Sequence, residues 1–262
     1  MSVLITFEGG DGSGKSTQAA LLEQHLSERG YDVVALQEPG STSLGAYLRD
    51  WLKAERPESE ALEPVSELLM FLAARAQLVA ELVKPALDRP DAVVICDRYI
   101  DSTVAYQGYG RGLDVGLIDS LNAIAIDGAV PDLTLLIDVP PEVALGRVNP
   151  GSDSSHTATT RDELEGMRRF EEEDAAFHAR VHQGYVELAK GEPERWRVVD
   201  GTRAAEEVAN DVQVLAGEAL PDIELEAATE RAPVAEEQVA EKQGTKEPVS
   251  GNGGDSNQPN LF

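Results

Sequence analysis

The chain has 262 residues, of which 42% are hydrophobic, so it is long enough to bury one substantial core, and one catalytic domain with a tail is the simplest organisation. Its formal net charge of -26, from 48 acidic and 22 basic residues, disfavours nonspecific attraction to nucleic acid or to an anionic membrane surface. No run approaches the about 18 apolar residues of a membrane span, and the first residues lack a signal-peptide pattern, so we expect a cytoplasmic protein without direct nucleic-acid binding.

The first predicted elements are a strand and a phosphate-binding loop. Residues 3–7 form a short apolar run, which is typical of a buried strand. The loop that follows matches the P-loop pattern G-x-x-x-x-G-K-[ST] and consists of Gly9, Gly10, Asp11, Gly12, Ser13, Gly14, Lys15 and Ser16, with Thr17 next. Glycines let backbone N–H groups turn toward phosphate oxygens, and the start of a helix adds partial positive charge. We therefore predict a nucleotide site in which Lys15 reaches the β and γ phosphates and Ser16 coordinates Mg²⁺.

The rest of the chain alternates between strand and helix patterns. Further short apolar runs occur at residues 33–36, 92–96, 133–137 and 197–199. Between them lie stretches of helical period, of which the longest, residues 62–87, should be kinked or ended by Pro85. Cys96 lies inside an apolar run, so we expect a buried, inert thiol. The alternation predicts an α/β protein with a three-layer P-loop fold, in which helices flank a five-stranded parallel sheet.

Polar residues follow the third predicted strand. Asp97 and Arg98 stand where that strand ends, at the edge of the sheet that also carries the P-loop. There Asp97 can hold Mg²⁺ or its waters and Arg98 can meet a phosphate, although a local surface ion pair is the alternative. No N-K-x-D string occurs in the chain, which argues against a signalling GTPase. A P-loop alone does not separate kinases from other nucleotide-binding proteins, so the acceptor site must decide.

Two segments lack the pattern of packed structure. Residues 149–160 are rich in Gly, Ser, Asp and Thr, which predicts a mobile loop within a lid at about residues 146–170. From residue 221 onward, nine acidic residues stand against three basic ones, which predicts a disordered acidic tail. We place the catalytic domain at residues 1–217 and the tail at residues 218–262.

Four motifs resemble the thymidylate kinase family in their order and spacing. They are Phe7-Glu8-Gly9-Gly10-Asp11-Gly12-Ser13-Gly14-Lys15-Ser16-Thr17, Glu38-Pro39-Gly40, Phe71-Leu72-Ala73-Ala74-Arg75, and Asp97-Arg98-Tyr99 with Ser102-Thr103-Val104-Ala105-Tyr106-Gln107-Gly108. The resemblance runs from about residue 3 to about residue 215. It implies a bacterial-type enzyme that makes dTDP from dTMP with ATP and Mg²⁺, for dTTP synthesis, and a homodimer packed through helices. A related kinase for another acceptor and a non-enzymatic nucleotide-binding protein are the alternatives.

The resemblance implies a site for the base and sugar of dTMP. Phe71 would stack on the thymine ring, and Arg75, one helical turn later, would hydrogen-bond the base. Gln107 would contact the thymine edge with Thr103 beside it, and Tyr106 would pack against the deoxyribose. Taken singly, Phe71 fits a core position and Gln107 fits a turn. Their joint order within the four motifs favours the binding site.

The resemblance also assigns residues to the dTMP phosphate. Arg49 and Arg98 would hold it, Asp11 would reach the sugar 3′-hydroxyl or the metal shell, and Glu38 would lie near the same pocket. Without the family, Arg49 fits a solvated helix face equally well. The nucleophile would be a phosphate oxygen that is already ionised, so no general base is required.

Catalysis by such an enzyme depends on cations that neutralise the transferred group. Members of the family carry one of these arginines either in the P-loop or in the lid, and this chain has Gly12 at the P-loop position. The lid should therefore supply it, and Arg161 and Arg169 are the catalytic candidates beside Lys15 and Arg98. Arg147 is assigned to ATP. This lid is longer and richer in Ser and Thr than the family leads us to expect.

The last residues of the chain form a possible docking peptide. Gln258, Leu261 and Phe262 resemble the short Q-x-x-L-F peptides by which bacterial replication proteins bind the sliding clamp. A flexible tail would then tether the enzyme near replication. A featureless terminus is the alternative reading.

Overall fold

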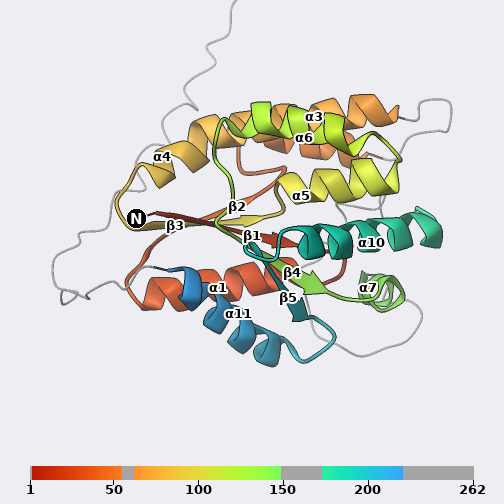
Figure 1. The fold of residues 1–262 in the computed structure, drawn as a ribbon. Helices are drawn as coiled ribbons and strands as arrows, with labels where there is room; N and C mark the ends of the chain where they lie inside the picture. The colour runs from red at the N-terminus through yellow and green to blue at the C-terminus, as the bar shows by residue number, and fades with distance from the viewer. Residues whose placement is uncertain (1, 55–61, 149–172, 221–262) are drawn as a thin grey trace, which may run out of the picture. The chain divides into compact units, whose positions relative to one another are not determined.

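A five-stranded parallel sheet forms the centre of the fold (Figure 1). The protein is represented by a computed structural model that describes residues 2–54, 62–148 and 173–220. The strand order is β2-β3-β1-β4-β5. The strands are β1 (Val3–Glu8), β2 (Asp32–Gln37), β3 (Ala92–Asp97), β4 (Leu133–Asp138) and β5 (Trp196–Asp200). All five predicted strands are found, each longer by one or two residues, which confirms the α/β prediction.

Helices cover both faces of this sheet. Helices α1 and α11 lie on one face, and α3, α4 and α6 lie on the other (Figure 1). The helical elements in the described ranges are α1 (Lys15–Glu28), α2 (Ser43–Lys53), α3 (Pro64–Leu78), η2 (Val79–Val83), α4 (Lys84–Leu87), α5 (Ile100–Thr103), η3 (Val104–Gly110), α6 (Val115–Ile126), α7 (Pro141–Val148), α10 (Ala175–Gly191) and α11 (Ala205–Ala219). Within those ranges, no helix has both the length and the apolar character needed to cross a membrane.

The helix predicted over residues 62–87 continues past its proline. It is built from α3, the π-helical segment η2 and the short α4, and Pro85 stands in the final turn. A proline lacks the N–H that would bond within the helix, and its ring crowds the preceding turn. The wider turn of η2, closed by the bond from the Lys84 backbone N–H to the Val79 carbonyl, comes directly before it. The helix therefore ends two residues after Pro85 and not at it.

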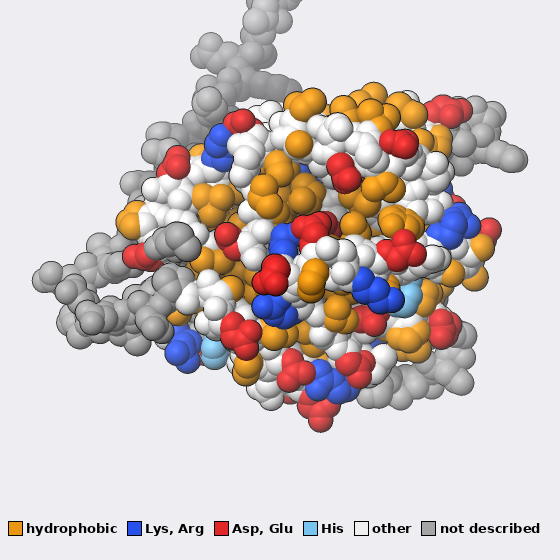
Figure 2. All heavy atoms as spheres, viewed as in Figure 1, with side chains coloured by type: hydrophobic (Ala, Val, Ile, Leu, Met, Phe, Trp, Pro, Cys, Tyr) orange, Lys and Arg blue, Asp and Glu red, His pale blue; other side chains and the backbone are white. Residues whose placement is uncertain are grey.

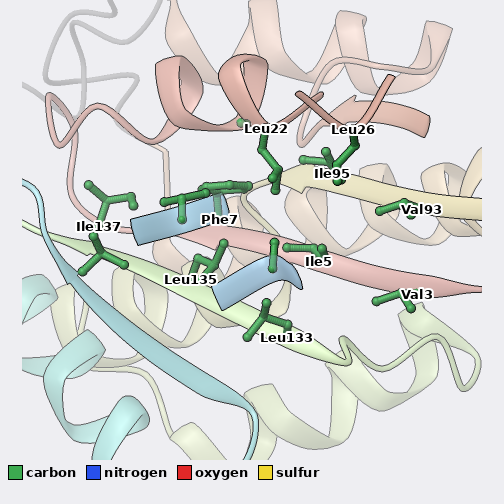
Figure 3. Close-up of a cluster of buried hydrophobic side chains, with 14 of the residues drawn as sticks. Val3, Ile5, Phe7, Leu22, Leu26, Val93, Ile95, Leu133, Leu135 and Ile137 are labelled. Atoms are coloured by element: carbon green, nitrogen blue, oxygen red, sulfur yellow. The ribbon is translucent and has the colours of Figure 1, made fainter. Parts of the chain in front are cut away.

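The central strand β1 supplies side chains to two separate cores. Ile5 and Phe7 pack against Leu22 of α1 on one face of the sheet (Figure 3). Leu4 points to the other face, into a core that includes Cys96. Because β1 is buried on both sides, its sequence is mostly apolar, with Thr6 and Glu8 as its buried polar residues. Burial raises the pKa of the Cys96 thiol well above its ordinary value, as the prediction of a buried, inert cysteine requires.

Helix α10 approaches η3 through two glycines. A Cβ added to Gly110 would lie 2.7 Å from the Phe177 ring, and one added to Gly184 would lie 2.7 Å from the Tyr109 ring. Only glycine permits such close contacts. This packing places α10, which follows the lid segment in the sequence, beside the segment that carries Tyr106 and Gln107.

Candidate active site

Glycines shape the loop between β1 and α1. Gly9, Gly12 and Gly14 have φ angles of 144°, 78° and 94°, which other residues rarely adopt. A Cβ on Gly9 would also lie 2.7 Å from the Ile137 carbonyl oxygen, so this glycine lets the loop pass over β4. The 14-residue helix α1 begins at Lys15, directly after the loop. The loop therefore lies at the partial positive charge of a helix N-terminus, where anions bind.

Lys15 lies folded against the loop. Its buried ammonium group donates a hydrogen bond to the Gly10 carbonyl at 3.2 Å. Burial, and then repulsion from Arg98, lowers the pKa of Lys15 to about 8. An anion bound in the loop would reverse that effect, because a nearby negative charge favours the protonated lysine.

Ser16 and Asp97 meet beside the loop. The Ser16 hydroxyl donates to Asp97 Oδ2 at 2.5 Å. The other oxygen, Asp97 Oδ1, is buried and has no hydrogen-bond partner among the described residues. A hydroxyl next to a carboxylate with an open oxygen fits a hard cation such as Mg²⁺. Over the described ranges no group of three or more His, Cys, Asp or Glu side chains could hold a metal, so this pair would share the ion with phosphate oxygens.

Arg98 is the centre of a buried polar network. Its guanidinium group donates to the Gly9 carbonyl at 3.1 Å and to Asp11 Oδ1 at 2.6 Å. The same group also donates to the hydroxyls of Ser102, Tyr106 and Tyr185. Burial works against the charge of Arg98, but attraction to Tyr106 and Asp11 outweighs it and raises the pKa of the guanidinium above its ordinary value. A permanent positive charge therefore lies where the P-loop meets β3.

Asp11 is held in its ionised form in this network. Its two oxygens accept from Arg98 and, at 2.6 Å, from the Tyr106 hydroxyl. Burial works against the charge, but attraction to Arg98 and Lys15 outweighs it and keeps the pKa of Asp11 below its ordinary value. The P-loop and the segment that carries Tyr106 are thereby fixed to each other through one carboxylate.

A pocket opens beside Arg98. It is lined by Glu38, Pro39, Phe71, Arg75, Arg98, Tyr99, Ser102, Thr103, Tyr106 and Gln107. Seven of the nine residues predicted to bind dTMP line it. The other two border it: Asp11 bonds to Arg98, and Arg49 donates to the carbonyl of the pocket residue Pro39 at 2.8 Å. Residues from the four motifs, together with Arg49, thus come together at the carboxyl ends of β2 and β3.

Arg75 is fixed in the wall of this pocket. It donates to Glu38 Oε2 at 3.1 Å, to Asn122 Oδ1 at 2.5 Å and to the Tyr99 carbonyl at 3.0 Å. Nη2 also lies 2.5 Å from Glu38 Oε1, so four of the five N–H groups of the guanidinium face protein oxygens. Burial opposes its charge, but attraction and hydrogen bonding to Glu38 outweigh it and raise the pKa of Arg75. Arg75 is therefore held rigidly, and one of its N–H groups is left for a ligand.

Of the arginines predicted to act in the lid or on ATP, the structure describes only Arg147. Arg147, near the end of α7, donates to the Ser13 carbonyl at 3.4 Å and to the Gly201 carbonyl at 3.0 Å, so it lies against the P-loop. Arg161 and Arg169 lie outside the described residues. Their assignments stay predictions.

Glu8, to which the sequence alone assigned no role, contacts the pocket residues Tyr99 and Ser102. Its buried carboxylate accepts from the Tyr99 backbone N–H at 2.8 Å and from the Ser102 hydroxyl at 2.6 Å. Tyr185, 177 positions away, donates to the same oxygen at 3.1 Å. Burial, and then repulsion from Asp101, raises the pKa of Glu8 to about 7. The only sequence feature that could have indicated a role for Glu8 is its place as an acidic residue at the end of an apolar strand.

This pKa predicts a pH-dependent stability. Between pH 4.5 and 7 the folded protein keeps a proton on Glu8 that the unfolded chain releases, so stability present below pH 4.5 is lost as the pH rises. Relative to Glu8→Gln, the wild-type free energy of unfolding should fall by roughly 2–3 kcal/mol from pH 5 to pH 8. Urea unfolding at both pH values measures this. Glu63→Gln, at an exposed position, is the control. The prediction is contradicted if the difference in unfolding free energy between wild type and Glu8→Gln is the same at both pH values, as it should be for the control.

Comparison with known proteins places the chain among enzymes of one kind. The family model described as thymidylate kinase matches residues 7–212. A thymidylate kinase of Thermomicrobium roseum is 47% identical over 212 residues, covering 81% of this chain and 93% of that protein. One of Geotalea uraniireducens is 46% identical over 207 residues, covering 79% and 92%. The crystal structure of thymidylate kinase from Ehrlichia chaffeensis aligns with a TM-score of 0.62 and 37% identity, covering 82% of this chain and 98% of that one.

Proposed function

This chain belongs to the thymidylate kinase family and is a dTMP kinase that uses ATP, and from that premise we propose how its residues carry out the reaction. One observation carries the proposal: the pocket that gathers the predicted dTMP residues ends at Arg98, which is hydrogen-bonded to the P-loop itself. Donor and acceptor phosphates would therefore meet at Arg98. The γ-phosphoryl group would pass in line from ATP to a dTMP phosphate oxygen, giving dTDP for dTTP synthesis.

The donor half holds the ATP phosphates. Backbone N–H groups of residues 9–17 would surround them, and Lys15 would leave the Gly10 carbonyl to reach the β and γ phosphates. Arg147, already against Ser13, is placed to add a contact to ATP. Ser16 and Asp97 would hold Mg²⁺, which when bound neutralises charge on the phosphates.

The acceptor half reads the base. Phe71, on α3, would stack on the thymine ring, and Tyr106 would pack against the deoxyribose. Arg75 would donate to the thymine O4, while Gln107, with Thr103 beside it, would contact the N3–H. A donor next to an acceptor complements thymine and opposes cytosine, which presents the reverse pattern.

The phosphate of dTMP would lie between Arg49 and Arg98. It is ionised at neutral pH, so no residue needs to remove a proton. Asp11 is paired with Arg98 and would reach the sugar 3′-hydroxyl or the metal shell, and Glu38 is paired with Arg75. Rate enhancement then comes from holding two polyanions in line and neutralising the equatorial oxygens of the transferred group. Arg161 and Arg169 would add charge when the lid closes.

An acceptor panel tests this function. Production of ADP would be followed in a coupled assay with dTMP, dUMP, UMP, AMP and GMP in turn, each with Mg²⁺. We expect dTMP to have the highest kcat/KM. Faster turnover of a purine or a ribonucleotide would point to a kinase for another acceptor, and ATP binding without turnover of any acceptor would point to a non-enzymatic role.

An apolar surface on α3 and α6 supports the homodimer. Val65 and Leu69 on α3, and Leu117 and Ile124 on α6, are all more than half exposed, and Figure 2 shows hydrophobic side chains gathered over these helices. Their spacing of four and seven residues puts each pair on one helix face. A monomer seldom exposes such a face. Light scattering should give twice the 28.1 kDa of one chain, and Ile124→Glu should shift the mass to the monomer; a wild-type monomer would contradict the proposal.

The C-terminal segment would link a cytoplasmic enzyme to replication. Gln258, Leu261 and Phe262 lie outside the described residues, so this proposal stands on the sequence alone. A peptide of residues 251–262 should bind a bacterial sliding clamp saturably, and the same peptide with Leu261 and Phe262 replaced by alanine should not. Equal binding by the two peptides would end the idea.

A further inference from the structure

A buried carboxylate fixes the orientation of the Gln107 amide. Glu67, on α3, is completely buried, and its Oε1 accepts a hydrogen bond from Gln107 Nε2 at 2.8 Å. An ionised carboxylate accepts hydrogen bonds and cannot donate one. The nitrogen of the Gln107 amide must therefore face Glu67, so the chemistry of the neighbour decides between the two possible amide orientations.

Arg111 donates to both oxygens of Glu67. Its Nε lies 3.1 Å from Glu67 Oε1, and its Nη2 lies 3.2 Å from Oε2, so it spans both oxygens. Arg111 is itself held from the other side, by an ion pair of 2.5 Å with Glu173 and by the Phe177 ring 4.7 Å below its guanidinium carbon. Both Glu67 oxygens therefore accept from a fixed cation, and Oε1 also accepts from Gln107.

The fixed amide leaves its oxygen for the ligand. Gln107 lines the acceptor pocket, and because its Nε2 is bonded to Glu67, its Oε1 is the end of the amide that a ligand would meet. Arg75 lines the same pocket. The pocket wall thus combines a donor, Arg75, with an acceptor, the Gln107 oxygen, whose orientation is fixed by Glu67. Thymine, with O4 and N3–H, matches this pattern, whereas cytosine would bring its N3 lone pair against an oxygen.

We propose that Glu67 is a positioning residue for base selectivity, which acts by holding the Gln107 carbonyl oxygen toward the base. The inference rests on the proposed role of Gln107 in reading the thymine edge. Glu67 itself does not line the pocket. Its effect is on the polarity that Gln107 presents, and so on the choice between thymine and cytosine rather than on ATP or on the phosphates.

The test replaces the fixed acceptor with a group that can also donate. In Glu67→Gln, the new amide can donate to the Gln107 oxygen, so Gln107 can turn its nitrogen to the base. We expect the ratio of kcat/KM for dTMP over dCMP to fall by about tenfold or more, with an absolute rise in dCMP turnover. Glu63→Gln, the same change at an exposed position one helical turn earlier, is the matched control and should keep the wild-type ratio.

A structural role predicts a different result. If Glu67 only supports the fold, turnover of dTMP and dCMP should fall by the same factor, and that outcome overturns the proposal. Should Glu67→Gln fail to fold, Glu67→Met, which also removes the fixed acceptor, is tested by the same ratio and decides in the same way. If Gln107→Ala keeps the wild-type ratio, the fault lies in the proposed role of Gln107, and the inference built on it is withdrawn.

Discussion

Replacing Arg98 with alanine is expected to lower kcat for dTMP phosphorylation by on the order of a thousandfold. Arg98 is buried, is permanently charged, and is hydrogen-bonded to the P-loop at Gly9 while lining the acceptor pocket. No other arginine that the structure describes has both connections. Charge that develops on the transferred group would therefore lose its fixed partner, and a coupled assay at saturating ATP and dTMP measures the loss.

Folding must be separated from catalysis in this variant. Removal of Arg98 leaves Asp11 buried without its ion pair, and breaking a buried pair costs about 3–5 kcal/mol. Circular dichroism and thermal unfolding show whether the variant is folded at the assay temperature. Arg98→Lys keeps the charge and should recover part of the rate. Arg89→Ala, which removes an exposed arginine paired with Asp32 at 3.3 Å, is the matched control. Near-normal turnover by Arg98→Ala would refute its assignment.

Replacing Lys15 with methionine should lower kcat by about a hundredfold to a thousandfold. Methionine keeps much of the length of the side chain but removes the charge that would follow the γ-phosphate during transfer. The effect should appear mainly in kcat, because the interaction strengthens as charge moves onto the leaving oxygen. Coupled assays at varied ATP concentration separate kcat from KM.

An exposed lysine supplies the control for this experiment. Lys84→Met removes a cation of the same kind, whose partner Asp127 lies at the surface away from the P-loop. It should keep the wild-type kcat, since exposed ion pairs contribute little. If Lys15→Met also keeps the wild-type kcat and loses only affinity for ATP, Lys15 binds the donor without stabilising the transition state.

The donor site was predictable because its chemistry is contiguous. Nine successive residues, 9–17, contain the glycines, the lysine and the hydroxyl, and the local backbone alone explains their spacing. The three central strands, β1, β3 and β4, were predictable for a related reason, since each is buried on both faces and therefore mostly apolar. Acceptor residues such as Phe71 and Gln107 carry no such local signal. The family resemblance was needed to single them out.

By itself, the sequence determined the P-loop, the parallel α/β fold and the family, because each of these depends on residues close together or on patterns that repeat along the chain. Only the tertiary structure decided how the side chains are held. It placed Glu67 behind Gln107, Asn122 against Arg75, and Tyr185 against Glu8 across 177 positions. The orientation and the charge of a buried group depend on the neighbours that desolvate it and hydrogen-bond to it. Those neighbours come from distant segments that meet only when the chain folds.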